Sequence, residues 1–114
     1  MMTIQALKEY GANTQEGVGR CMGNEAFYLR LVGMLASDTH TEQLEKALAE
    51  GNLKAAFEAA HALKGVLSNL AITPALQPVS EITEYLRAQT DMDYQPLLSQ
   101  IRQAMDGLMA IIQG

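Results

Sequence analysis

The chain contains two histidines, His40 and His61, and only His61 has neighbours whose types and spacing suit chemistry. A neutral imidazole is a nucleophile near pH 7 and can carry a transferred group. Lys64, three residues later, would bring a compact positive charge beside the ring, where a transferred anion would need it. Gly65 would leave the helix backbone beside the ring uncovered, although a glycine inside a helix costs about 1 kcal/mol relative to alanine. The pattern predicts an imidazole that is open to a partner and able to accept an anionic group.

The histidine lies on a predicted helix over residues 53–71, and helical geometry places it outside the core. At about 100° per residue, the apolar side chains of this helix fall on one stripe that must pack inward. The stripe consists of Leu53, Ala56, Ala60, Leu63, Leu67 and Leu70. His61 points roughly 130° away from the centre of that stripe. We therefore expect an exposed ring, with the small residue Ser68 extending the opening beside it. Three residues on this face are expected to contact a docked partner: Phe57, Glu58 and Ile72.

The remainder of the chain also predicts helices. All three prolines follow residue 73, and no run of strand length alternates apolar and polar residues. Apolar spacing and capping residues predict two short helical segments before residue 24 and four longer helices after it. The longer helices are predicted over 24–51, 53–71, 73–89 and 94–113.

Two of these helices carry signals that complicate their regular course. Residues 37–43 hold no apolar side chain, and Thr39 and Glu42 have capping-box spacing, so we expect a kink or a restart there. Thr73 is expected to cap the helix predicted over 73–89. That helix should become regular only from Pro78, because proline lacks a backbone donor.

Four helices joined by short loops predict an all-α fold, an antiparallel up-down-up-down four-helix bundle with a short helical N-terminal extension. A chain of 114 residues has room for one hydrophobic core, so we expect a single domain over 1–114. Within it, residues 1–23 would form the extension and residues 24–113 the bundle. The initiator-like pair Met1-Met2 favours a free-standing protein.

Composition narrows the class of protein. The formal net charge of −5 has the wrong sign for binding nucleic acid or an anionic membrane surface, and it favours a monomer. No apolar run approaches the ~20 residues that a membrane span needs. Cys21 is the one cysteine, so we expect no intrachain disulfide, no cysteine zinc site and a cytoplasmic protein.

His61 has no triad partner and no metal-ligand spacing, and His40 lies in a polar stretch typical of solvated surface. We therefore expect neither hydrolytic nor metal chemistry.

The segment around the histidine resembles a known signature. Ala60-His61-Ala62-Leu63-Lys64-Gly65 is similar to the His-x-Leu-Lys-Gly motif of histidine-containing phosphotransfer (Hpt) domains. Further short stretches resemble those of the family: Tyr10-Gly11, Gly23-Asn24, Phe27-Tyr28, Ala47-Leu48, Gly51-Asn52, Ser68-Asn69-Leu70 and Leu86-Arg87. The resemblance covers nearly the whole chain and implies the same four-helix bundle.

The resemblance implies a carrier in a two-component phosphorelay. His61 would accept a phosphoryl group from the aspartyl phosphate of a receiver domain and pass it to an aspartate of another receiver. Lys64 would help to hold the phosphoryl group, and Gly65 would clear room for the receiver. Its partners would be response-regulator receivers, a hybrid sensor histidine kinase, or both. Because the receiver supplies Mg²⁺ and the aspartate, the carrier would need no cofactor and would not itself be an enzyme.

Two positions depart from the family pattern, and one alternative function stays open. Many members have glycine ten residues after the histidine, where this chain has Ala71, and some have glutamate where it has Thr83. We therefore expect no carboxylate partner for His61. The alternative is a catalytically silent, Hpt-like helical adaptor that binds a receiver or a kinase without being phosphorylated.

Overall fold

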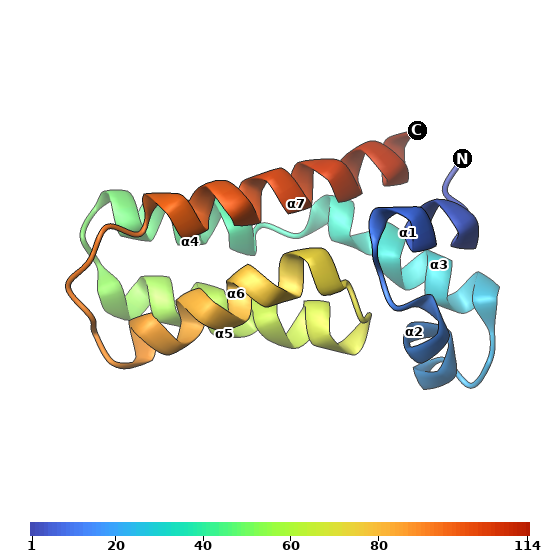
Figure 1. The fold of residues 1–114 in the computed structure, drawn as a ribbon, viewed down its shortest axis with the longest axis horizontal. Helices are drawn as coiled ribbons and strands as arrows, with labels where there is room; N and C mark the ends of the chain where they lie inside the picture. Colours follow the sequence, from blue (N-terminus) through green and yellow to red (C-terminus); the bar gives the residue numbers. More distant parts are fainter.

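The computed structural model describes residues 1–114 and contains helices but no strands (Figure 1). The elements are α1 (Ile4–Tyr10), α2 (Thr14–Arg20), α3 (Glu25–Gly33), the 3₁₀ turn η1 (Met34–Ser37), α4 (His40–Ala49), α5 (Leu53–Asn69), α6 (Thr73–Arg87) and α7 (Gln95–Gln113). The prediction of an all-α protein is confirmed. None of the helices is long and apolar enough to cross a bilayer.

Helix α5, which carries His61, packs between two neighbours. It contacts α4 on one side and α6 on the other, and α6 in turn contacts α7. Figure 1 shows the chain reversing direction at each connection between α4 and α7. Helix α7 also reaches α4, where Arg102 binds the carboxylate of Glu45. This hydrogen bond raises the pKa of Arg102 above its ordinary value. The outer face of α5 remains uncovered by another helix.

A restart, and not a continuous helix, occupies the polar stretch at residues 37–43. Helix α3 passes into η1, Asp38 is extended with ψ of 133°, and α4 begins at His40. The predicted capping box does not form. The Asp38 carboxylate accepts the backbone N–H of His40 at 2.8 Å, and the Thr39 hydroxyl accepts from the Gln43 side chain at 2.8 Å. A side chain one residue earlier than expected therefore caps α4.

Helix α6 starts earlier than the proline rule suggested. It begins at Thr73, with Ile72 in the capping position, and it runs through Pro78. Pro78 lies in the second turn, where it removes one intrahelical hydrogen bond. The expectations that Thr73 itself caps this helix and that it becomes regular only from Pro78 are therefore wrong.

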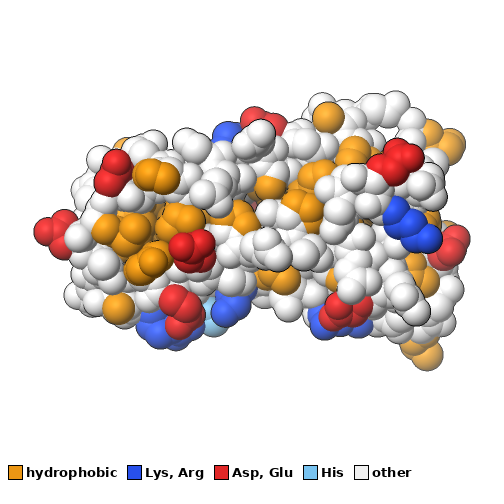
Figure 2. Space-filling model, in the orientation of Figure 1, with side chains coloured by type: hydrophobic (Ala, Val, Ile, Leu, Met, Phe, Trp, Pro, Cys, Tyr) orange, Lys and Arg blue, Asp and Glu red, His pale blue; other side chains and the backbone are white.

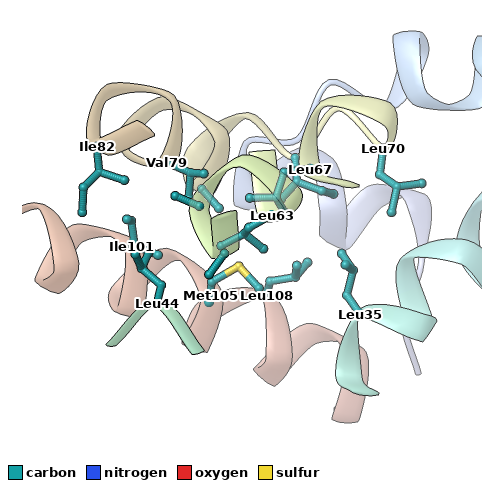
Figure 3. Close-up of a cluster of buried hydrophobic side chains, with 14 of the residues drawn as sticks. Leu35, Leu44, Leu63, Leu67, Leu70, Val79, Ile82, Ile101, Met105 and Leu108 are labelled. Carbon is teal, nitrogen blue, oxygen red and sulfur yellow. The ribbon is translucent and has the colours of Figure 1, made fainter. Parts of the chain in front are cut away.

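One hydrophobic core joins all parts of the chain. It includes Leu63 and Leu67 of α5, which point toward Met105 and Leu108 of α7 (Figure 3). The stripe predicted for α5 is buried, except that Leu53 is only partly so. The same core contains Leu7, Ala12 and Cys21 from the N-terminal segment. That segment is thus packed into the core and does not lie loosely on its surface.

Residues of the first three helices hold the C-terminal end of α5. The Tyr28 hydroxyl donates to the carbonyl of Leu70 at 2.8 Å, and Arg20 Nη1 donates to that of Ser68 at 2.6 Å. The backbone N–H of Asn13 donates to the carbonyl of Ala71 at 2.9 Å. The last carbonyls of a helix have no partner within it, so Tyr28 and Asn13 satisfy carbonyls that would otherwise need water, while the Ser68 carbonyl also accepts the backbone N–H of Ala71 at 3.2 Å.

Candidate functional site

His61 lies in the middle of α5 with its side chain exposed. Its ring stacks on Phe57, one turn earlier, with centroids 5.6 Å apart and an angle of 17° between the planes. The hydrogen bonds that histidine rings make in this structure belong to His40, not to His61. The two ring nitrogens of His61 are therefore free to meet a partner. None of the main surface hollows is lined by His61, so the ring stands on an open surface.

Gly65 leaves a bare patch of helix one turn after the histidine. A Cβ added there would meet no atom within 4 Å, so nothing in the chain requires glycine at this position. Ser68 follows on the next turn and is partly buried. The opening predicted beside His61 is thus available to an incoming molecule.

Positive charge lies beside the ring. Lys64 is partly exposed and takes part in none of the six ion pairs of the structure. Figure 2 shows basic side chains on both sides of a histidine at the lower edge of this face of the molecule. A compact ammonium that no carboxylate neutralises can bind an anion held on the ring.

A contact between α5 and α6 adds a residue that the sequence did not identify as part of the site. The guanidinium carbon of Arg87 lies 5.0 Å from the centroid of the Phe57 ring. Arg87 is also paired with Glu84, at 3.4 Å between nitrogen and oxygen. Phe57 was expected to contact a docked partner, and the structure shows it partly buried between His61 and Arg87. The spacing of Phe57 and His61 indicated that they share a face, but no local pattern links Phe57 to Arg87.

The other two predicted docking residues lie in different surroundings. Glu58 is exposed and lines a groove that α5 forms with α4, opposite the flank on which Phe57 meets α6. Ile72 is completely buried, so its side chain is not available to a partner and this prediction is wrong. Helix α5 ends at Asn69 and Ala71 has a positive φ of 55°, so Ile72 no longer follows the helical wheel.

The two departures from the family pattern also have a structural reading. Thr83 is completely buried and its hydroxyl donates to the Val79 carbonyl at 2.6 Å, so this position does not face the histidine surface. Ala71 lies just past the end of α5, where its left-handed backbone is one that glycine adopts more easily.

His40 has a local structural role. Its Nδ1 lies 3.0 Å from both carboxylate oxygens of Asp38, at the start of α4. No group of three or more histidine, cysteine, aspartate or glutamate side chains with an arrangement that could hold a metal ion lies there or elsewhere in the chain. The arrangement thus orders the beginning of a helix.

The sequence model of the Hpt domain matches residues 34–111, which include α4 to α6, most of α7 and every predicted site residue. The chain belongs to the Hpt domain family. Hpt domains are phosphocarriers of two-component signalling and interact with receiver domains and kinases. No curated protein and no solved structure showed significant similarity to the chain.

Proposed function

We propose that this Hpt domain carries a phosphoryl group on His61 between receiver domains of a phosphorelay. The observation that carries the proposal is the exposed imidazole of α5, which has free nitrogens and stands beside the open backbone of Gly65 and the unpaired Lys64. A nucleophile on an open surface needs a partner to complete the reaction site, because water must be excluded while the group moves.

The transfer is an in-line displacement at phosphorus. The lone pair of an unprotonated ring nitrogen forms the N–P bond as the P–O bond to the donor aspartate breaks, and its electron pair leaves with the carboxylate. The ring keeps the proton on its other nitrogen and carries the positive charge. In the second step a carboxylate oxygen of the acceptor aspartate attacks phosphorus, the N–P bond breaks, and neutral imidazole is restored.

The neighbouring residues take separate roles in this proposal. The Lys64 ammonium offsets part of the charge on the transferred group, and Gly65 with Ser68 gives the receiver access to the ring. The receiver supplies Mg²⁺ and the aspartate, so the carrier contributes the nucleophile and its surroundings. Glu58 lies on the α4 flank of the histidine, where a docked receiver would meet it, and Phe57 lies on the α6 flank.

The same proposal fixes the finer description of the protein. In this description residues 24–113 form an antiparallel up-down-up-down four-helix bundle. Its first helix consists of α3, η1 and α4 in succession, and α5, α6 and α7 are the other three. Residues 1–23 form the N-terminal extension. A core that closes within one chain supports a monomer. The single cysteine, Cys21, supports a cytoplasmic location.

The test is transfer of radioactive phosphate from a phosphorylated receiver to the purified protein. We expect an acid-labile, base-stable phosphate that is absent in His61→Gln and retained in the matched variant His40→Gln. Lys64→Ala should transfer more slowly, by about tenfold, which is less than the ~10²–10³ lost with a buried charge-stabilising donor. Lys54→Ala, on the same helix, is its control. Binding of receivers without phosphorylation of the wild-type protein would replace this function with the silent adaptor.

A further inference from the structure

The ring of His61 is one end of a series of two contacts that joins α5 to α6. Phe57 lies parallel to the imidazole, and the guanidinium of Arg87 lies over Phe57. We propose that Phe57 and Arg87 are positioning residues that hold the imidazole of His61 in the orientation needed for phosphoryl transfer. This inference rests on the proposed function, because it concerns the same nucleophile.

The first contact fixes the plane of the ring. Residues four apart on a helix share a face, and a centroid distance of 5.6 Å with nearly parallel planes lies in the range of offset aromatic pairs. The terminal torsion of a histidine is otherwise broadly distributed. Since no hydrogen bond restrains the His61 ring, stacking on Phe57 is the interaction by which this chain can orient it.

The second contact fixes Phe57. Arg87 is the last residue of α6, where the helix dipole favours a cation, and Glu84 holds its guanidinium from one turn earlier. The guanidinium lies over the aromatic face at 5.0 Å, within the range of a cation–π contact. Phe57 is thus held from α6 while it supports a ring on α5.

The geometry suits a nucleophile. The lone pairs of the imidazole nitrogens lie in the plane of the ring, whereas stacking covers a face of the ring. The stack can therefore restrict rotation without blocking the edge that attacks phosphorus. A ring that is already oriented loses less conformational freedom when the receiver docks, and this favours the reactive geometry.

The experiment compares Phe57→Leu with Phe27→Leu, which alters the other phenylalanine of the chain, an exposed residue of α3. In Phe57→Leu we expect the ring protons of His61 to lose the upfield NMR shift caused by a stacked phenyl ring. With saturating phosphorylated receiver, the maximal transfer rate should fall by about three- to tenfold, since small misplacements of reacting groups have effects of this size or larger. The receiver concentration at half-maximal rate should stay the same. Phe57→Tyr should restore both the shift and the rate, and Phe27→Leu should change neither.

Three results would overturn the inference. The His61 resonances could be unchanged in Phe57→Leu, the maximal rate could be unchanged although the shift is lost, or only the half-saturating concentration could rise, which would make Phe57 a docking residue. A wild-type protein that accepts no phosphate would instead overturn the proposed function, and the NMR comparison would still report whether the rings stack.

Arg87 is tested in combination with Phe57. Arg87→Gln should reduce the maximal rate by about twofold, in line with the loss of one exposed cation–π contact. If Arg87 acts through Phe57, the same change should have no effect in the Phe57→Leu background. Equal effects in both backgrounds would show that Arg87 acts independently, and its role as a positioning residue would be wrong.

Discussion

Gly65 lies on a surface where folding and partner access make different demands. A side chain here would touch nothing in the chain, and alanine is the better residue inside a helix. We expect Gly65→Ala to raise the free energy of unfolding by about 0.5–1 kcal/mol, measured by urea denaturation. Transfer from a phosphorylated receiver should nevertheless slow, because the added methyl group occupies the space through which the receiver reaches His61.

A small phosphate donor provides the control for this variant. Phosphoramidate needs no docking surface, so its reaction with His61 should proceed at the wild-type rate in Gly65→Ala. Equal slowing with both donors would contradict a role in access and would point to a changed histidine.

The exposure of His61 could be predicted because its helix has a regular apolar stripe, from which the direction of every other side chain follows. The burial of Ile72 could not, since it depends on where the helix ends. Ala71 has a left-handed backbone, so the helical periodicity that predicts side-chain directions does not extend beyond that residue. A local sequence pattern therefore describes this site well in the middle of α5 and poorly at its end.

At the scale of the elements, three helices are followed by a residue other than glycine whose backbone is left-handed, and Met22, after α2, is the first of these. Ala71 follows α5 with φ of 55°, and Gln89 follows α6 with φ of 54°. A left-handed backbone costs about 1–2 kcal/mol for residues other than glycine. Ala71 is buried, whereas Gln89 is exposed. A substitution by glycine would therefore remove a buried methyl group at position 71 and an exposed side chain at position 89.

We expect Gln89→Gly to stabilise the protein by about 1 kcal/mol, because it relieves the strained backbone and removes no buried group. Ala71→Gly should leave stability nearly unchanged, since the loss of a buried methyl group, about 0.8 kcal/mol, offsets most of the relief. Chemical denaturation of both variants measures the difference. A larger gain at Ala71 than at Gln89 would contradict this account.

Helix α2 carries a second matched pair of positions. A Cβ at Gly17 would lie 2.3 Å from Cε1 of Tyr28, a buried ring that also holds the end of α5, whereas a Cβ at Gly19 would meet nothing within 4 Å. We expect Gly17→Ala to destabilise the protein by about 1–3 kcal/mol through overpacking. Gly19→Ala should be neutral or stabilising by up to about 1 kcal/mol. Thermal unfolding of the two variants checks this, and equal midpoints would show that α2 does not pack on Tyr28 in solution.

The existence of each helix followed from apolar spacing, but the cap of α4 and the start of α6 did not. Asp38 and Thr39 both have side-chain oxygens near the start of α4. Which of them accepts the first backbone N–H of the helix depends on the backbone conformation after η1. The position of Pro78 likewise did not predict the start of α6. Its missing donor removes a single hydrogen bond, and burial of Val79 and Ile82 in the core outweighs that loss.

At the scale of the whole molecule, the partly buried Tyr10 and the buried Tyr28 join distant segments through hydrogen bonds of their hydroxyl groups. The Tyr10 hydroxyl of α1 donates to the Ala104 carbonyl of α7 at 2.7 Å, and burial raises the pKa of Tyr10 to about 12. Burial also raises the pKa values of Tyr28 and Tyr94. A raised pKa means that the folded protein holds its phenol protons more tightly than the unfolded chain. The stabilisation is therefore complete below pH 10 and is lost as the pH rises toward 12.

We expect the free energy of unfolding to fall between pH 10 and about 12, and Tyr10→Phe to reduce the slope of that fall. The same variant should be less stable by about 1 kcal/mol at pH 7, because the Ala104 carbonyl loses its donor. Urea denaturation as a function of pH measures both effects. Tyr85→Phe, at an exposed position of α6, is the control, and an identical slope in the two variants would contradict the role given to Tyr10.

Contacts between helices were the least predictable part of the candidate site. Phe57 and Arg87 meet because α5 and α6 pack side by side, and the angle between two helices depends on the side chains of the whole interface. The motif around His61 predicts the proposed nucleophile and the lysine near it, whereas the contact of the Phe57 ring with α6 requires the assembled fold.

The donors that hold the end of α5 couple the motions of this helix end to those of the N-terminal segment. Asn13, Arg20 and Tyr28 bind carbonyls in the last turn of the helix that carries His61 and just beyond it. Departure of the segment would leave the Leu70 and Ala71 carbonyls without these donors and would remove one of the two donors of Ser68, so we expect opening of residues 1–28 and fraying of the end of α5 to occur together in hydrogen exchange. A fragment cut to the matched range of 34–111 would keep the histidine and lose these donors. Residues before the matched range thus help to keep the end of the histidine helix ordered.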